Sequence, residues 1–307
     1  MFIIAHRKFF FWLTGLILAA ALLAIIVWRL PLGIDFTGGS LMQVRYLPAQ
    51  AGENGRPALG TIEEQVRAAD LDIGAASVRE FGTDGVSIRT RTLEPHEHDT
   101  LLAALSAGKS DFQELAFTSV GPALGSQFTS KALWAILAVA LVIVLYIAFA
   151  FRRVSGPVPG WGYGLTVVAM LIIDIIVPAG FFAAYAHFTG AEVDSLFIVA
   201  MLALLGYVVN DIIVVFDRVR EHLSRNEREN IREEFEVTIG KSIDETMTRS
   251  INTSVTVALA LIALIWLGAP ATRVFALVML VGVVAGTFSS ICRSAPLLIP
   301  IARWFNK

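Results

Sequence analysis

The sequence predicts an α-helical membrane protein with six transmembrane helices and one outward ferredoxin-like α+β domain. Hydrophobic residues make up 56% of the 307 residues, and charged residues only 16%. The mean hydropathy of +0.69 is above that of soluble globular domains. A more polar stretch of roughly 100 residues between the first two apolar segments alternates strand and helix patterns. Together these observations predict a membrane bundle that carries one folded extramembrane domain.

Six stretches are long and apolar enough to cross a hydrocarbon core of about 30 Å, which takes about 20 helical residues. They cover residues 9–28, 132–151, 163–185, 196–216, 251–267 and 274–291. The first stretch is longer than the apolar part of a typical signal peptide. We therefore expect an uncleaved anchor, with a cleaved signal peptide as the alternative.

Basic residues near the span ends are unevenly distributed, although the formal net charge is only −2. If the spans alternate in direction, one side holds His6, Arg7, Lys8, Arg152, Arg153, the arginines from 218 to 249, Arg293, Arg303 and Lys307. The opposite side has only Arg29 and Arg273 close to span ends. The positive-inside rule therefore places both termini in the cytoplasm.

The stretch between the first two spans reads as β-α-β-β-α-β, the ferredoxin-like order. Its segments are "LMQVRY", "TIEEQVRAADL", "SVREFG", "GVSIRT", "PHEHDTLLAALSAG" and "ELAFTSV". Thr61 and Glu64 have capping-box spacing at the first helix. A turn at Thr83, Asp84 and Gly85 joins the middle strands, while the second helix has Pro95 near its start and Gly108 near its end.

No enzyme motif is visible in this domain: it lacks a glycine-rich phosphate loop, a Cys/His cluster and a Ser/His/Asp set. His96 and His98 are two residues apart and point to different faces of a helix, so we expect solvated surface rather than a metal pair. The single cysteine, Cys292, excludes an intrachain disulfide. We expect a binding or lever module and no catalytic activity.

The predicted organisation has four parts. They are a first transmembrane helix (1–28), the outward domain (29–130), helices two to six (131–292) with a charged cytoplasmic loop (217–248), and a C-terminal interfacial segment (293–307). The alternating charges of the loop are typical of a solvated helix with mixed-sign pairs.

A carboxylate lies within the fourth span, in "GYVVNDIIVVFDR". Asp211 is about 9 Å along a helix from Asp217 at the boundary, and an ionisable group at such a depth costs at least ~2.5 kcal/mol on insertion scales. Small and polar residues share its helix face: Ala203, Gly206, Tyr207 and Asn210. This stripe predicts a face that looks into a helix bundle.

Arg249, at the start of the fifth span, is a partner for Asp211 at a comparable depth. Asn252 and Thr253, with Thr256 and Ala260, continue a second polar stripe. Two interpretations stay open: a static buried pair that fixes helix register, or a carboxylate that binds and releases a proton as Arg249 approaches and withdraws.

Other spans also carry small or polar residues. Gly282 and Gly286 have the small-xxx-small spacing that permits close helix approach, and Ser289, Ser290 and Arg293 follow them. Asp174 lies in the third span, one turn before Pro178, and its spacing favours structure and function equally. Residues 33–39, taken alone, predict a flexible exit from the first span.

Five stretches resemble the SecD/SecF family of bacterial protein-export membrane proteins. They are "GIDFTGG" (33–39), "VGPALG" (120–125), "EVDSLFIVAMLALLGYVVNDIIVVFDRVRE" (192–221), "SIDETMTRSINTS" (242–254) and "GVVAGTFSSICRSAP" (282–296). The resemblance covers the whole chain in order, and it is closest to the SecF members of the family.

The resemblance implies a subunit that works with a SecD-like subunit beside the SecYEG channel and the SecA ATPase, on unfolded preproteins in the bacterial cytoplasmic membrane. It implies protons as the coupling ion, no cofactor, and contacts with lipids but no nucleic acid. It also implies that Asp211 and Arg249 transfer protons, with Asn210, Asn252, Thr253 and Asp174 as a supporting polar seam. Gly33, Asp35, Gly38 and Gly39 would form the junction to the outward domain.

Two departures from the family pattern concern the spans. Ile173 stands where the family usually has a His before Asp174, which excludes a relay through that His and puts in doubt a role for the third span in the proton path. Val208 stands in place of a Ser. Two alternative functions are half of a proton-driven small-solute or lipid exporter, and a non-transporting assembly scaffold.

Overall fold

The structure is a computed structural model that describes residues 2–47, 56–69, 74, 76–81, 84–106, 112–152 and 156–305. The chain forms two compact units. A helical unit comprises Met1–Leu30, Leu133–Ala191 and Ser195–Lys307, and a sheet unit comprises Pro31–Ala132 and Glu192–Asp194. The sheet unit therefore includes a short segment from the connection between the third and fourth long helices.

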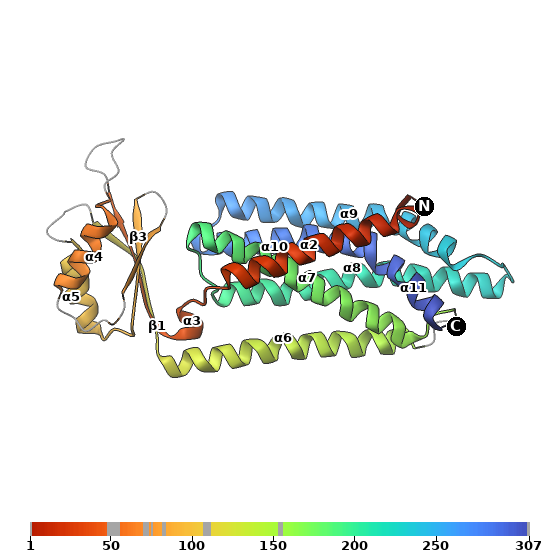
Figure 1. The fold of residues 1–307 in the computed structure, drawn as a ribbon, viewed down its shortest axis with the longest axis horizontal. Helices are drawn as coiled ribbons and strands as arrows, with labels where there is room; N and C mark the ends of the chain where they lie inside the picture. The colour runs from red at the N-terminus through yellow and green to blue at the C-terminus, as the bar shows by residue number, and fades with distance from the viewer. Residues whose placement is uncertain are drawn as a thin grey trace. The chain divides into compact units, whose positions relative to one another are not determined.

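Six segments are long and apolar enough to cross a membrane, as predicted (Figure 1). They are α2 (Arg7–Trp28), α6 (Pro122–Ala150), α7 (Gly160–Thr189), α8 (Ser195–Arg228), α9 (Phe235–Leu267), and α10 (Pro270–Ser289) continued through η1 (Ser290–Ser294) into α11 (Ala295–Phe305). η1 is a π-helix. A four-residue helix, α1 (Phe2–Ala5), precedes α2. The predicted fold class, six spans with one small α+β domain, is confirmed.

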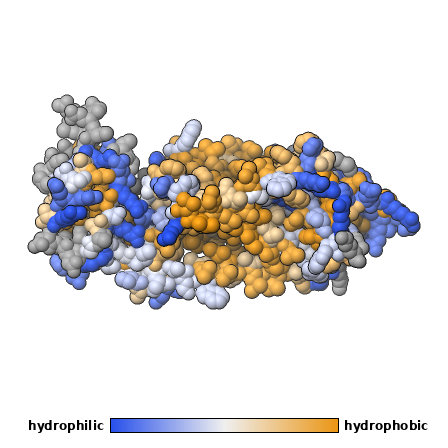
Figure 2. Space-filling view, viewed as in Figure 1, coloured by the Kyte–Doolittle hydropathy of each residue, from blue (hydrophilic) through white to orange (hydrophobic). Residues whose placement is uncertain are grey.

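Three of these segments form the centre of the helical unit. The apolar windows of α7, α8 and the α10–α11 segment are 50%, 44% and 50% buried, whereas those of α2, α6 and α9 are 17%, 6% and 17% buried. Hydrophobic residues dominate the middle of this unit's visible surface, and hydrophilic residues gather at the end that carries both termini and the α8–α9 connection (Figures 1 and 2).

Glycines allow α8 and α10 to approach closely, as their spacing predicted. A Cβ on Gly282 would lie 2.2 Å from Leu204 Cδ1, and one on Gly286 would lie 2.4 Å from Val208 Cγ2. Leu204 and Val208 of α8 therefore occupy the space that the side chain of any larger residue at position 282 or 286 would need. Dispersion contacts of this kind hold membrane helices together, because lipid is as apolar as the side chains.

The charged loop predicted for 217–248 is largely helical. α8 continues to Arg228 and α9 begins at Phe235, so only six residues connect them. The predicted mixed-sign pairs are present: Arg218 lies 2.6 Å from Glu221 on its own helix and 2.9 Å from Glu245 on α9. These pairs extend the contact between the two helices beyond their apolar segments.

The sheet unit has the predicted β-α-β-β-α-β order. Its elements are α3 (Ile34–Thr37), β1 (Gly39–Tyr46), α4 (Leu59–Ala68), β2 (Ser77–Phe81), β3 (Gly85–Thr90), α5 (Pro95–Ser106) and β4 (Phe112–Val120). The four strands are antiparallel in the order β2-β3-β1-β4. Alternate strand residues such as Met42, Val44 and Ile88 pack against Ile62 of α4 and Leu101 of α5.

The two helix starts differ from each other. The capping box predicted at Thr61 is wrong, because α4 begins two residues earlier, with Ala58 at its N-cap and no side-chain cap. α5 begins at Pro95 as predicted, and the Glu94 N–H donates to Glu97 Oε2 at 2.9 Å. The hydrogen bond from Arg91 and that backbone bond lower the pKa of Glu97 to about 2. Thr83 and Gly108, named in the predicted turn and helix end, lie outside the described residues.

His98 is packed rather than solvated, which corrects the expectation from sequence. Its side chain is only 16% exposed, and its ring nitrogens lie 2.9 Å from Glu114 Oε1 and 3.1 Å from Asp99 Oδ1. Its ring also lies against Phe117 of β4. Burial alone lowers the pKa of His98, but the hydrogen bonds to Glu114 and Asp99 outweigh burial and raise it. His96 is exposed, as expected.

We predict that His98 makes the stability of the sheet unit depend on pH. A histidine with a raised pKa contributes stability that is complete below about pH 6.5, its unfolded value, and is lost as pH rises through the folded value. Hydrogen exchange of β4 in the full chain should therefore show protection that falls over this window. His98→Gln should remove the dependence, whereas His96→Gln on the same helix should keep it. Equal pH dependence in both variants would contradict the prediction.

We also predict that Gly286→Ala destabilises the helical unit by about 1–3 kcal/mol, the usual penalty of overpacking. The new methyl group would overlap Val208. Thermal unfolding in detergent measures the effect. Gly15→Ala is the matched control, because nothing lies within 4 Å of a Cβ there. If both variants unfold at the wild-type temperature, α8 and α10 do not depend on this contact.

Candidate functional site

Asp211 lies where α8, α9 and the start of η1 meet. Ser250 Oγ of α9 donates to Asp211 Oδ1 at 2.5 Å. Ser290 is the first residue of η1, and its Oγ donates to Asp211 Oδ2. Each carboxylate oxygen thus has one hydroxyl donor from a different helix. The carboxylate is half-buried, and its hydrogen-bond donors among the described residues are these two hydroxyl groups.

A second layer of hydroxyls lies one turn away on α8, α9 and α10. Tyr207 Oη lies 2.8 Å from Ser254 Oγ, and Thr287 Oγ1 donates to that same serine at 2.5 Å. Ser250, Ser254 and Thr287 were missed as site residues by sequence reasoning. The four-residue spacing of Ser250 and Ser254, matching that of Tyr207 and Asp211, was a usable signal.

Arg249 does not pair with Asp211. Among the described side chains no ion pair within 4.0 Å joins them, and Arg249 is exposed while its neighbour Ser250 is buried. Asn252 and Thr253 are also exposed, and the Thr253 hydroxyl donates to the Arg249 carbonyl at 3.0 Å. The interpretation of a static buried Asp211–Arg249 pair therefore finds no support in this arrangement.

The polar stripe of α8 lies on the outside of the helical unit, which corrects the prediction that it looks into this bundle. Ala203, Gly206 and Asn210 are exposed, whereas Val208 and Ile212 are buried. The physical reason is that the apolar face of α8 packs against α7 and α10. Among the described residues of the stripe, Tyr207 and Asp211 are the two whose side chains form hydrogen bonds with other helices of the chain.

Asp174 belongs to a second buried polar cluster. It is 3% exposed, accepts a hydrogen bond from Ser289 Oγ at 3.1 Å, and lies 3.4 Å from Arg293 Nη2. Arg293 is 4% exposed, and its Nε has no hydrogen-bond partner. Because Ser289 and Ser290 are consecutive, the carboxylates of α7 and α8 are both bound at the start of η1.

The junction residues form a tightly packed corner rather than the flexible exit that the sequence predicted. Asp35 lies in the first turn of α3, and Gly33 N–H donates to the Val193 carbonyl at 2.8 Å. Gly38 and Gly39 have φ of +74° and +118°, which disfavour other residues. A Cβ on Gly39 would lie 2.6 Å from the Thr90 carbonyl.

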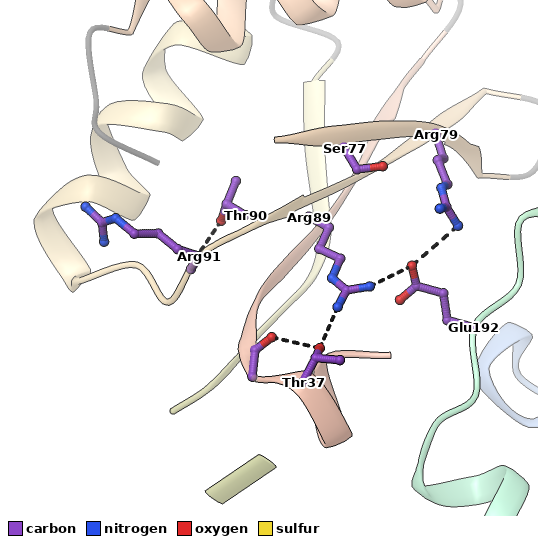
Figure 3. A pocket seen from close by; sticks show the side chains of 8 residues that line it. Thr37, Ser77, Arg79, Arg89, Thr90, Arg91 and Glu192 are labelled. Carbon is purple, nitrogen blue, oxygen red and sulfur yellow. Dashed lines mark hydrogen bonds and ion pairs between the residues drawn. The ribbon is translucent and has the colours of Figure 1, made fainter. Parts of the chain in front are cut away.

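A polar pocket of about 400 Å³ lies beside this corner within the sheet unit (Figure 3). Arg89 donates to Thr37 Oγ1 at 2.5 Å and to Glu192 Oε1 at 3.1 Å, and Arg79 lies 3.4 Å from the same carboxylate. Both guanidinium groups therefore point at Glu192, which fixes the segment 192–194 to the sheet. Within the described part of the chain no group of three or more His, Cys, Asp or Glu side chains could hold a metal ion.

Comparison with known proteins identifies the family. The family described as "Protein export membrane protein SecD/SecF, C-terminal" matches residues 100–304, and the "SecD/SecF GG Motif" matches residues 29–46. The protein translocase subunit SecF of Thermobaculum terrenum is 36% identical over 99% of this chain and 94% of its own length. SecF of Synechocystis is 31% identical over 89% of this chain and 83% of its own.

Among solved structures, SecDF from Thermus thermophilus, a translocon-associated membrane protein, matches with a TM-score of 0.81 and 27% identity over 99% of this chain. The chain spans 38% of the length of that solved protein. The six apolar helices and these relatives make the protein an integral membrane protein. The resemblance inferred from the sequence motifs is confirmed: the chain belongs to the SecD/SecF family of protein-export membrane proteins, as a SecF-type translocase subunit.

Proposed function

We propose that this chain pairs with a SecD-like subunit and uses the proton gradient to promote preprotein translocation across the bacterial cytoplasmic membrane. The observation that carries the proposal is the environment of Asp211, a carboxylate within a membrane-spanning helix whose hydrogen-bond partners among the described residues are hydroxyl groups. Ionisable groups at such depths persist mainly where they are paired, hydrated or used.

The hydroxyl partners suit a group that changes protonation state. A serine hydroxyl can donate to a carboxylate and can also accept from a protonated carboxyl, so Ser250 and Ser290 can serve both forms of Asp211. No described cation lies within 4.0 Å of Asp211, so its protonation leaves no guanidinium or ammonium group without a counter-charge. Asp211 is thus suited to bind and release a proton.

Arg249 is the second proton-transfer residue in this proposal. Arg249 immediately precedes Ser250 in the sequence, and the Ser250 hydroxyl donates to Asp211. A rotation of α9 by about 100°, the angle between successive residues of an α-helix, would bring Arg249 to the buried position that Ser250 now occupies. Approach of the guanidinium favours the ionised carboxylate, and its withdrawal favours the protonated form. Asn210, Asn252 and Thr253 would line the hydrated route to this site.

The exposed polar stripes support a partner subunit. Gly206 and Asn210 of α8, and Arg249, Asn252 and Thr253 of α9, are exposed within segments that cross the membrane. Lipid tails cannot satisfy such groups, whereas small and polar residues are typical of contacts between membrane helices. A SecD-like subunit that covers both stripes would bury Asp211 fully and complete the proton path.

The sheet unit would act as the outward lever on the exported chain. α8 begins at Ser195, immediately after the segment 192–194 that Arg79 and Arg89 hold to the sheet. The helix that carries Asp211 is thus joined to the sheet unit without a linker. In this proposal both termini lie in the cytoplasm, protons are the coupling ion, and SecYEG and SecA act on the same unfolded preprotein.

We predict that Asp211→Asn reduces gradient-driven completion of translocation to the level seen without a gradient, because the amide cannot carry a proton. Proteoliposomes that hold the full translocase measure release of a preprotein intermediate. Asp217→Asn is the matched control, since Asp217 is an exposed carboxylate on the same helix. Completion at the wild-type rate in Asp211→Asn would favour the scaffold alternative. Proton-driven movement of a small solute without preprotein would favour the exporter alternative.

We predict that Gly206→Leu weakens association with the SecD-like subunit while the chain itself folds normally. Nothing lies within 4 Å of a Cβ at Gly206, so the leucine projects only into the proposed contact. Co-purification in mild detergent measures association, and thermal unfolding of the isolated chain checks the fold. Gly15→Leu, equally free of neighbours, is the control. Wild-type co-purification of Gly206→Leu would exclude this face as the contact.

A further inference from the structure

The buried Asp174–Arg293 cluster has no part in the proton transfer described above, yet it is bound to the same turn of helix. Asp174 Oδ2 accepts from Ser289, the last residue of α10, and Oδ1 faces Arg293 within η1. One carboxylate of α7 therefore holds residues on both sides of the α10–η1 boundary. Ser290, which donates to Asp211, lies between these two points.

We propose that Asp174 and Arg293 form a positioning site that fixes this π-helical turn so that Ser290 donates to Asp211. The inference rests on the proposed function, because it concerns the proton affinity of Asp211. Single π-helical turns within α-helices occur frequently at functional sites. All five residues of η1 are buried, and the Ser294 hydroxyl donates to the Ser290 carbonyl at 2.5 Å, so the turn is held internally as well.

Charge explains why the two carboxylates have different roles. A guanidinium remains charged in proteins, so buried Arg293 needs a permanent counter-charge, and Asp174 lies within reach to supply it. Protonation of Asp174 would leave a buried cation unpaired, which is strongly unfavourable. Asp211 has no such restriction. Asp174 and Arg293 are therefore the fixed ion pair, whereas no described cation lies within 4.0 Å of Asp211.

Arg293 also contacts an aromatic ring. Arg293 Cζ lies 5.5 Å from the centre of the Phe288 ring, which gives the buried cation a second favourable contact. Near Asp211 and its two serine donors, the other titratable side chains on α8, α9 and η1 are Tyr207, Arg249 and Cys292. The proposal requires no change in their protonation.

The test follows Asp211 directly, by the infrared band of its protonated carboxyl, in the assembled complex with the SecD-like subunit. The band is assigned by its loss in Asp211→Asn. Ser290→Ala should move the titration midpoint to higher pH by about one unit, because one charge-assisted hydrogen bond to the ionised form is lost. The charge-free pair Asp174→Leu with Arg293→Met should move the midpoint in the same direction, and adding Ser290→Ala to it should cause no further shift.

Ser289→Ala provides a variant that changes no charge and only one small side chain. It removes one of the two attachments of Asp174 to the turn, so the midpoint should rise by part of the Ser290→Ala shift. Thr166→Ala is the matched control: Thr166 is a buried hydroxyl on α7 whose hydrogen bond among the described residues stays within its own helix, at the Gly162 carbonyl. The control should keep the wild-type midpoint.

A wild-type midpoint in Ser289→Ala, or in the charge-free pair once it assembles, would overturn the positioning role and leave the cluster as a packing element. Because the infrared readout does not require translocation, this failure is distinguishable from failure of the proposed function. If Asp211 titrates with the expected shifts but Asp211→Asn still completes translocation, the positioning role holds and the proton-driven function fails.

Discussion

The structure of the helical unit depends on the solvation of one carboxylate by short side chains. A serine hydroxyl reaches Asp211 only if the backbones of α9 and η1 come close to α8. Gly286 provides that approach, because Val208, three residues before Asp211, occupies the space of its missing Cβ one turn before Ser290. The Gly286–Val208 packing contact and the Ser290–Asp211 hydrogen bond are therefore parts of the same helix crossing. A larger residue at Gly286 would separate the donor from the carboxylate as well as loosen the packing.

Most of the fold was predictable, because its signals are local. Apolar runs of sufficient length predicted the six spans, and alternation with turn residues predicted the β-α-β-β-α-β order. The direction of each helix face was not predictable in the same way. In a soluble protein the polar face of a helix points toward water. Within a membrane, neither water nor lipid determines the direction in which the polar face of a helix points. The stripe with Ala203, Gly206 and Asn210 was identified correctly as a face, yet it lies on the outside of this chain's described bundle.

The site was predictable for charged residues and less so for the hydroxyls. Asp211 was identified because a carboxylate within an apolar span is conspicuous. Arg249 was chosen as its partner by charge and depth, but the adjacent Ser250 makes the contact, and serines are too common in membrane helices to be singled out. Arg293 was assigned to the cytoplasmic end of the last span by its charge. A π-helical turn shifts the following residues around the helix axis. No sequence pattern predicted this turn, and therefore none predicted that Arg293 is buried.

In the function proposed above, the contrast between buried Asp174 and half-buried Asp211 gives the protein a fixed part and a movable part in one helix layer. Asp174 is bound to a permanent cation, so α7 and η1 stay together whatever the proton does. In the function proposed above, the position of α8 and α9 relative to that fixed layer changes with the proton, because the hydroxyl partners of Asp211 can bind either protonation state. α8 contains no proline between Ser195 and Arg228 and acts as a continuous rod. At 1.5 Å per residue, Asp211 lies about 24 Å along this rod from its first residue. Glu192 is bound to Arg79 and Arg89 of the sheet, and residues 192–194 directly precede the first residue of α8. In the function proposed above, this direct connection links the charge change in the membrane to the movement outside it.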